Sequence, residues 1–455
     1  MNSNNRSSFS GKLGFVLSAA GASVGLGNIF RFPYLCAKYW GGIFLFVYII
    51  LALTFGYTMI IAETSIGRAS KKSPVGAFEA LGKTGAMKTG GWINAIIPML
   101  IVPYYSVIGG WVTKYFVSYI YKDVNEIAGD TFFSGFITNG YSSTIWFVIF
   151  ALIVLVIISL GVQQGIENAS RIMMPILVVL AILISIYSVT RPGALEGVKY
   201  LFIPNFENFS WMTVVSAMGQ MFYSLSIAMG ILITFGSYVK DEVSIEGSTR
   251  QVEFFDTAIA ILASVMIIPA VFSFSGGDSN ALKAGPSLMF MTMPKIFASM
   301  GFGRIMGILF FLLVLFAAVT SAIALLESAV STLSDEFKLG RIPATLIMGV
   351  IMVCLGCLSS LGYGPLATVT VFGMQFLDFF DFLTNSVMMP IAALFICVLV
   401  THHMGIGAIE DEVTRGGHSF RRKGVFSFMI RFLCPVFIII ILISSIATVL
   451  GAIQM

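Results

Sequence analysis

The chain has 455 residues, 57% of them hydrophobic and 11% charged, with a mean hydropathy of +0.94 and a net charge of +4. These values lie far outside the range of soluble domains and indicate an integral membrane protein. The sequence has no basic domain with interleaved aromatic residues, which argues against nucleic-acid binding.

The apolar runs fit membrane-spanning α-helices, which need about 20 apolar residues each, and they are too long for barrel strands. The fold class is therefore all-α and polytopic. Eleven spans are predicted, at residues 13–36, 43–66, 94–121, 144–161, 167–190, 211–238, 256–275, 304–332, 341–360, 370–400 and 426–452. Lys and Arg concentrate in the loops that lie on the same side of the membrane as the N-terminus. The positive-inside rule therefore predicts a cytoplasmic N-terminus and, after an odd number of spans, an extracytoplasmic C-terminus.

The first span contains an unusual polar stretch, SAAGASVGLGNIFRFP, at residues 18–33. Glycine lets a helix unwind easily, and a helix broken inside the membrane leaves carbonyl oxygens unpaired, at several kcal/mol each. A cation such as Na⁺ satisfies these oxygens, while the freed helix N-termini attract a carboxylate. Close helix packing through Gly21 and Gly25 is the alternative. That alternative explains neither Asn28 nor Arg31.

The sixth predicted span carries a second polar break, between Ser224 and Gly230. The two breaks correspond if residues 13–190 and 211–400 are two repeats of five spans, the second inverted in the membrane because five is odd. Residues 426–452 then form an extra eleventh helix. Because no long linker divides the chain, we expect a single transporter domain.

Several motifs in these spans resemble the neurotransmitter:sodium symporter family. The stretches are GASVGLGNIFRFP (21–33), VPYYSVIGGW (102–111), GQMFYSLSIAMG (219–230), FAAVTSAIALLE (316–327) and DFFDFLTNS (378–386). The resemblance covers nearly the whole chain and implies the LeuT-type fold, a 5+5 inverted repeat with discontinuous helices 1 and 6. It implies a sodium-coupled amino-acid symporter of a bacterial inner membrane, working by alternating access, and not an enzyme.

The same resemblance implies two sodium sites. One, Na1, would combine the carboxylate of the substrate with oxygens of Ser23, Asn28, Ser224 and Asp256. The other, Na2, would use oxygens of Gly21, Val24, Ala317, Thr320 and Ser321. Adjacent Thr and Ser residues in an apolar span often bond to their own helix, which is the alternative for the last two.

Asp256 stands at or next to the position where the family has an Asn ligand, and Ile259 stands where a relative has a nearby glutamate. Animal members that lack both carboxylates use chloride to balance the sodium charges. We therefore expect Asp256 to supply the negative charge, and chloride not to be required. The alternative is that Asp256 is the N-cap of the seventh span.

The substrate is predicted from Gly25, which stands where animal monoamine carriers have an aspartate. The substrate must then bring its own carboxylate, which indicates an α-amino acid, with Tyr105 as a hydrogen-bond donor to it. The expected substrate-binding residues are Ser23, Gly25, Gly27, Ile101, Tyr105, Tyr223, Ser224, Ser226, Met229, Ser321 and Leu325. Their apolar members disfavour charged side chains, and the flexible Met229, in place of a bulkier phenylalanine, favours large or aromatic ones.

Two charged pairs resemble the gates of the family. Arg31 and Asp381 match the outer gate, and a lone charge at depth would cost about 2.5–3.5 kcal/mol. Asp378, one turn earlier, is an alternative partner for Arg31. Arg6 and Asp335 match the inner gate.

A Gly-X9-Pro motif, Gly165 to Pro175, lies at the start of the fifth span. Glycine and proline both weaken a helix, so this segment is expected to unwind from its cytoplasmic end and open a water path to Na2. A static kink is the alternative. Phe9, near the inner gate, stands where the family usually has a tryptophan.

Two other functions fit parts of the pattern. A transporter-like amino-acid sensor could use the same scaffold. An ion channel would also contain carbonyls at membrane depth, but selectivity filters arise from rings of like elements, whereas this chain has two unlike breaks.

Overall fold

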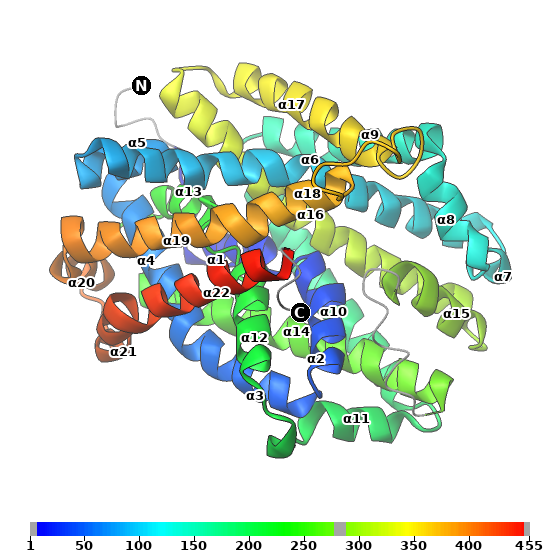
Figure 1. The fold of residues 1–455 in the computed structure, drawn as a ribbon. Coiled ribbons are helices and arrows are strands. Elements are labelled where there is room, and N and C mark those ends of the chain that lie inside the picture. Colours follow the sequence, from blue (N-terminus) through cyan, green and yellow to red (C-terminus); the bar gives the residue numbers. More distant parts are fainter. Residues whose placement is uncertain (1–6, 277–287, 450–455) are drawn as a thin grey trace.

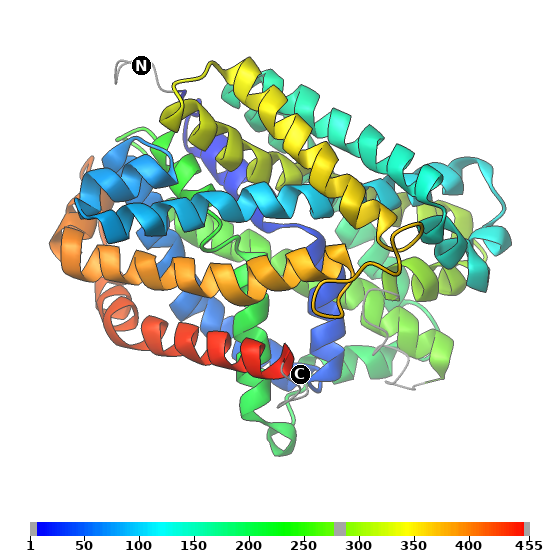
Figure 2. The same ribbon diagram turned by 45° about the horizontal axis from the view of Figure 1, so that its top comes forward.

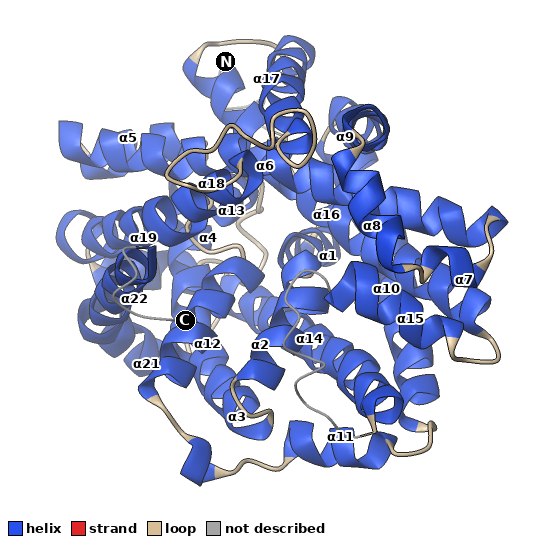
Figure 3. Ribbon diagram, turned by 45° about the vertical axis from the view of Figure 1, so that its right-hand side comes forward, coloured by secondary structure: helices blue, strands red, loops and turns tan. Residues whose placement is uncertain are grey.

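The computed structural model describes residues 7–276 and 288–449, and Figure 3 shows that they are built of helices. Within these residues, the β-structure is confined to one isolated bridge between Val371 and Met374. Nine helices in the described ranges are long and apolar enough to cross a membrane, and a bent pair at the start of the chain passes the same test. The predicted all-α polytopic class is confirmed.

The continuous spans match the predicted apolar runs. In chain order they are α3 (Gly42–Leu51) with α4 (Tyr57–Ser70), α6 (Gly85–Tyr121), α9 (Gly140–Ser159), α10 (Asn168–Val189), α14 (Ile245–Ser275), α16 (Gly303–Glu336), α17 (Arg341–Leu361), α18 (Phe376–Asp381) with α19 (Met389–Val398), and α21 (Lys423–Phe428) with α22 (Cys434–Val449). Several of them contain π-helical turns, which are η3 (Ala52–Gly56), η4 (Val162–Glu167), η8 (Phe382–Met388), η9 (Leu399–Met404) and η10 (Met429–Leu433).

The first and sixth spans are interrupted, as predicted. The first consists of α1 (Lys12–Ser23), the π-helical η2 (Gly27–Arg31) and α2 (Phe32–Lys38), and its two parts meet at an angle of 51°. The sixth consists of α12 (Trp211–Ser224) and α13 (Ile231–Ser237), separated by residues 225–230.

Both interruptions lie inside the bundle. Every residue of α1 from Gly14 to Ser23 is buried, which small and apolar side chains on all faces of the helix permit. It packs against α10, α14 and α16, and α13 packs against α4 and α16. Figure 1 shows α1 behind α19, in the middle of the molecule.

Short helices cover the two ends of the bundle. α5 (Pro74–Gly82) and α20 (Ile406–Thr414) lie at the left-hand end in Figure 1, the end that also holds the described start of the chain. α7 (Val124–Ile127), α8 (Asp130–Thr138) and α15 (Met293–Ala298) lie at the right-hand end, and Figure 2 shows the cyan α7 and α8 there as well. α11 (Ala194–Phe202) lies beside α14.

The seventh span begins earlier than predicted, and this overturns one alternative. α14 starts at Ile245, where the Ser244 hydroxyl caps it by accepting the backbone N–H of Gly247 at 3.1 Å. Asp256 therefore lies well inside the helix, and the proposal that it is the N-cap is wrong. Glu246 and Glu253 lower the hydropathy of the stretch before residue 256, so the sequence did not place it in the span. In the structure both glutamates are buried and paired, and the helix begins at Ile245.

Candidate functional site

The break in the first span leaves main-chain oxygens inside the bundle. α1 ends at Ser23 because Val24 adopts an extended conformation, with φ −76° and ψ 92°. The carbonyl of Ala22 accepts hydrogen bonds from the hydroxyls of Ser226, at 3.0 Å, and Ser321, at 3.1 Å. The first break is thus joined both to the break in the sixth span and to α16.

The break in the sixth span is held open by a buried carboxyl group. Ser226 and Ala228 adopt left-handed conformations, with φ 54° and 59°, which cost about 1–3 kcal/mol each for residues with a side chain. The backbone N–H of Ala228 donates to Glu63 Oε1 in α4 at 2.7 Å. Sequence analysis missed Glu63, although an acidic residue within an apolar span is itself a signal of function.

Asp256 is fully buried and surrounded by neutral donors. Its Oδ1 accepts hydrogen bonds from Asn28 Nδ2 at 2.7 Å and Ser224 Oγ at 2.8 Å, and its Oδ2 accepts one from the Tyr48 hydroxyl at 3.0 Å. In the described part of the chain, no cationic side chain pairs with it within 4 Å. Buried charges are normally paired or bound to metals, so this environment suits a cation. Tyr48 was not among the predicted site residues.

Asn28 connects Asp256 to the first break. Its Oδ1 accepts the backbone N–H of Gly25 at 3.2 Å, while its Nδ2 also donates to the main-chain oxygen of Asp256 at 3.2 Å. The structure thus brings together Asn28, Ser224 and Asp256 from the predicted Na1 set. Ser23, the fourth member, lies at the end of α1, and its buried hydroxyl has no hydrogen-bond partner among the described residues.

The residues predicted for Na2 also converge. The Ser321 hydroxyl lies 3.2 Å from the carbonyl oxygen of Gly21 and 3.4 Å from that of Val24. The Thr320 hydroxyl donates to Phe316 O at 2.9 Å and contacts Ala317 O at 3.2 Å. Thr320 is therefore bonded to its own helix, whereas Ser321 reaches across to the first span.

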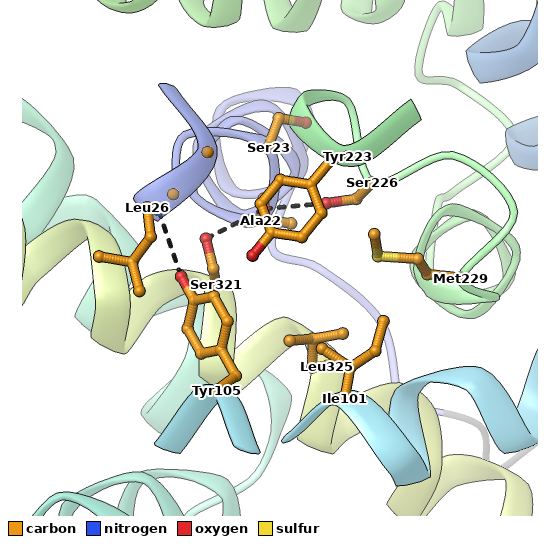
Figure 4. A pocket seen from close by; sticks show the side chains of 12 residues that line it. Ala22, Ser23, Leu26, Ile101, Tyr105, Tyr223, Ser226, Met229, Ser321 and Leu325 are labelled. Atoms are coloured by element: carbon orange, nitrogen blue, oxygen red, sulfur yellow. Dashed lines mark hydrogen bonds between the residues drawn. The ribbon is translucent and has the colours of Figure 1, made fainter. Parts of the chain in front are cut away.

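A small cavity lies between the two breaks, α6 and α16 (Figure 4). Its volume is about 20 Å³, on the order of one water molecule. The residues that line it are Ala22, Ser23, Gly25, Leu26, Gly27, Ile101, Tyr105, Tyr223, Ser226, Met229, Ser321 and Leu325. All the predicted substrate residues except Ser224 line the cavity, and Ser224 instead donates to Asp256. Ala22 and Leu26 were not predicted.

Two glycines set the shape of this cavity. An ideal Cβ at Gly25 would lie 2.5 Å from Ser321 Oγ, and one at Gly27 would lie 2.5 Å from Tyr223 Cδ1. The hydroxyl of Tyr105 lies 3.2 Å from that same Cβ position at Gly25. An aspartate or any other side chain at position 25 would therefore displace groups that line the cavity.

The predicted outer pair is not in direct contact in this conformation. Among the described residues, no ion pair within 4 Å joins Arg31 to Asp381 or to Asp378. The guanidinium of Arg31 instead lies over the ring of Tyr223, 5.4 Å from its centroid, and that ring also lines the cavity. Asp381 accepts a hydrogen bond from the Tyr104 hydroxyl at 3.3 Å.

At the opposite end, the chain before α1 is bound to the fifth span. Glu167 Oε2 accepts the backbone N–H of Ser10 at 2.9 Å, and its Oε1 accepts the Ser10 hydroxyl and pairs with Arg171 Nη2 at 2.7 Å. Arg171 also donates to Ser10 Oγ at 2.8 Å. We name Ser10, Glu167 and Arg171 the N-terminal latch. Sequence analysis missed it because Ser10 is 157 residues from Glu167 and 161 residues from Arg171 in the chain.

The predicted inner gate is only partly covered by the structure. Arg6 lies outside the described residues, and Asp335 Oδ2 accepts the backbone N–H of Ser73 at 2.8 Å. Phe9 is buried, with its ring 5.5 Å from that of Phe235 in an edge-to-face contact. An aromatic ring thus fills the position where the family usually has a tryptophan.

The Gly-X9-Pro motif spans the junction of η4 and α10. Gly165 lies in the π-helical turn, and an ideal Cβ there would lie 2.1 Å from the main-chain oxygen of Ile157. Pro175 lies inside α10. The chain is thus irregular at the glycine and helical at the proline in this conformation.

A polytopic bundle in which two interrupted spans meet at a small cavity, near a buried carboxylate that has no ion pair among the described residues, has the construction of a secondary transporter. The chain belongs to the sodium:neurotransmitter symporter family, whose model matches residues 6–135 and 117–453. The family predicted from the sequence motifs is thereby confirmed, and the protein is a multi-pass, sodium-dependent transporter.

Known relatives resemble the chain over nearly its full length. It is 32% identical over 443 residues to YhdH, an uncharacterized sodium-dependent transporter of Bacillus subtilis (strain 168), with 96% of each chain covered. It is 31% identical to an uncharacterized sodium-dependent transporter of Methanocaldococcus jannaschii, with 90% of this chain and 84% of that one covered. Among solved structures it resembles MhsT in complex with L-phenylalanine, with a TM-score of 0.87, 36% identity, and 97% and 100% of the two chains covered.

Proposed function

We propose that this sodium-dependent transporter imports a neutral L-amino acid with a hydrophobic or aromatic side chain by alternating access. The observation that carries the proposal is the composition of the cavity between the two breaks. Polar main chain borders it on one side, while Ile101, Met229 and Leu325 border it on the other and disfavour charged side chains through desolvation. The crystal structure of MhsT with L-phenylalanine supports the same class of substrate.

The substrate carboxylate would lie near Gly25 and Tyr105. Gly25 leaves no protein side chain in this place, and the Tyr105 hydroxyl lies 3.2 Å from where a Cβ would be. The substrate ammonium would face the main chain around Ser224 to Ser226. Because the cavity holds only about 20 Å³ in this conformation, entry of an amino acid requires side chains such as Tyr223 and Met229 to move.

We assign two sodium ions to the neighbouring oxygen clusters. At Na1, the ion would bind the Asp256 carboxylate, Asn28, Ser224, the Ser23 carbonyl and the substrate carboxylate. At Na2, it would bind oxygens of Gly21, Val24, Ala317, Thr320 and Ser321, which requires the two hydroxyls to turn their lone pairs toward the ion. The buried charge of Asp256 offsets the charge of the ion, so chloride would not be required.

In the membrane, we assign the N-terminus to the cytoplasm and the C-terminus to the extracytoplasmic side of a bacterial inner membrane, following the distribution of Lys and Arg. Residues 13–190 and 211–400 would form the two inverted repeats of a single domain, and residues 426–452 the extra helix. The Arg31–Asp381 pair would close the outer side when the two side chains come into contact.

Uptake into proteoliposomes tests the proposal. With an inward sodium gradient, labelled phenylalanine should accumulate, and unlabelled leucine, tyrosine or tryptophan should compete while aspartate and lysine should not. Each Na⁺ entering at 100 mV contributes about 2.3 kcal/mol, so a negative interior should raise accumulation further. Replacing chloride with gluconate should leave the rate unchanged.

Three outcomes would contradict it. Sodium flux that does not saturate or depend on an amino acid would indicate a channel, and amino-acid binding without uptake would indicate a sensor. Loss of uptake in gluconate would contradict only the proposal that Asp256 balances the sodium charge in place of chloride.

A further inference from the structure

A second, larger cavity lies away from the transport site, between the second span and α14. Its volume is about 650 Å³, and Ile49, Leu53, Arg250, Phe254 and Arg422 are among the residues that line it. We name it the α3–α14 groove. Leu53 and Phe254 are 44% and 68% exposed, so the groove opens on the outer surface of the bundle.

The groove has two chemically different ends. Ile49 and Leu53 in the second span and Phe254 and Phe255 in α14 form apolar walls. Arg250 precedes Phe254 by one helical turn, which puts its cationic group on the same face of α14 beyond the apolar wall. A groove with a cationic end and long apolar walls is complementary to an amphipathic ligand that has an anionic group and an apolar chain.

Arg422 is fixed at the charged end by its surroundings. Its backbone N–H donates to Glu246 Oε1 at 3.2 Å, and the same oxygen accepts the Tyr57 hydroxyl at 3.0 Å. Its guanidinium lies 5.0 Å from the centroid of the Tyr57 ring. The arginine is therefore held in place before any ligand binds, which lowers the entropy cost of binding.

The Arg422 side chain is 31% exposed and lines the groove. Its buried Nη1 lies 3.5 Å from the buried Oε1 of Glu253. Glu246 and Glu253 equal the two arginines in number, but the exposed Arg250 has no ion pair of its own within 4 Å among the described residues. Guanidinium groups suit the multiple oxygens of a phosphate.

The charged end lies at the end of the bundle that contains the start of α1. The Cβ position of Gly247, which lines the groove, is 3.7 Å from Lys12 Nζ. A third cation therefore lies near the groove, beside the starts of α1 and α14. Lipid headgroups occur at the ends of membrane spans.

We propose that the α3–α14 groove binds an anionic phospholipid, with its phosphate between Arg250 and Arg422 and an acyl chain along Leu53 and Phe254. A free phosphate would leave the apolar walls unused. A zwitterionic phospholipid would bring a cationic group to the arginines and is disfavoured there. Basic pockets between spans are known to accept acidic headgroups, and each Lys or Arg near an anionic membrane surface contributes about 1 kcal/mol.

The test is native mass spectrometry of the full chain in detergent with equal amounts of phosphatidylglycerol and phosphatidylcholine. The unchanged protein should retain phosphatidylglycerol selectively. The double variant Arg250→Gln/Arg422→Gln should lower its affinity about 25-fold, or about fivefold per arginine. Lys83→Gln/Lys338→Gln, which removes the same charge from exposed loop positions outside the groove, should change it less than twofold.

Two further measurements cover failure of folding and the source of the anion. If thermal unfolding shows that the double variant is not folded, Arg250→Gln alone should still lower the affinity for phosphatidylglycerol about fivefold, because Arg250 is exposed. Phe254→Gln should lower this affinity as well. Glycerol phosphate at the same concentration should not compete. Equal losses in the groove and control variants, unchanged retention in the groove variants, or full competition by glycerol phosphate would each overturn the proposal.

Discussion

Asn28 holds Asp256 at two points, donating from one amide nitrogen to its main-chain oxygen at 3.2 Å and to its carboxylate at 2.7 Å. Because the other end of the same amide accepts the N–H of Gly25, the position of the first-span break depends on the position of α14. A change at either residue should therefore affect both the cation site and the cavity.

Asp256→Asn should lower sodium affinity at Na1 by about tenfold or more, because a neutral amide replaces a charged ligand in a buried site. Tyr48→Phe is the matched control, since it removes one hydrogen bond to the carboxylate and keeps its charge. Equilibrium binding of ²²Na⁺ measures both. The same sodium affinity in Asp256→Asn and the unchanged protein would show that this carboxylate is not a ligand.

Gly25→Ala should abolish amino-acid binding, because its Cβ would lie 2.5 Å from Ser321 Oγ in the wall of the cavity. Gly219→Ala is a suitable control, since it lies inside α12 and an added Cβ meets nothing within 4 Å. There, alanine should stabilise the helix by about 0.5–1 kcal/mol. Scintillation proximity binding of labelled phenylalanine and thermal unfolding compare the two variants. Binding by Gly25→Ala at the normal affinity would mean that substrate does not occupy this cavity.

Met229→Phe should change which substrates are accepted. A rigid ring in place of the thioether leaves less room, so the ratio of kcat/KM for tryptophan to that for leucine should fall about tenfold. Competition between the two labelled substrates in proteoliposomes gives this ratio directly. An unchanged ratio would place the substrate side chain elsewhere.

Glu167→Gln should weaken the N-terminal latch and favour opening at that end. Glutamine can accept through its single oxygen, so it keeps one of the two hydrogen bonds from Ser10 and loses the other. It also loses the ion pair with Arg171, whose exposed side limits that pair to about 1 kcal/mol or less. Hydrogen exchange over residues 12–23 should therefore rise severalfold. Glu196→Gln removes an exposed pair with Lys199 on α11 and should leave exchange in α1 unchanged. Equal exchange in both variants would show that the latch has no such role.

Pro175→Ala should slow transport and leave binding intact, because it restores a backbone donor inside α10 and makes this segment harder to unwind. Gly165→Ala is a poorer test than the motif suggests, since its Cβ would lie 2.1 Å from a main-chain oxygen and would perturb folding. Single-turnover uptake compared with equilibrium binding separates the two effects in Pro175→Ala. Normal turnover in this variant would favour the static kink.

The sequence predicts well the features that follow from local composition along the chain, namely the membrane spans and the two breaks. Apolar runs gave the spans, and glycines beside polar residues located both breaks. The start of α14 was misplaced because Glu246 and Glu253 resemble a solvated loop in sequence, although the structure buries and pairs them. Burial of a charged group depends on partners distant in the chain, here Tyr57 and Arg422, and a local pattern does not contain them.

The candidate site shows the same division. Residues carried by the family motifs converge around the breaks, but Tyr48 and Glu63 were missed because the motif stretches do not include the second span. The predicted pairing of Arg31 with Asp381 assumed contact, whereas the side chains adopt other contacts in this conformation. Rotamers of long charged side chains follow from the packing of several helices and not from spacing alone.

The π-helical turns have a consequence for how the tenth span is probed. η8 and η9 each hold a wider turn than an α-helix does, so the rotation per residue changes at Phe382, at Met389 and at Leu399. Counting in steps of 3.6 residues from Asp381 will therefore assign the wrong azimuth to residues beyond Met388. A cysteine-labelling profile along this helix should therefore show its period shift at η8, and a lipid-facing side assigned from the residues before Phe382 should not hold after Met388.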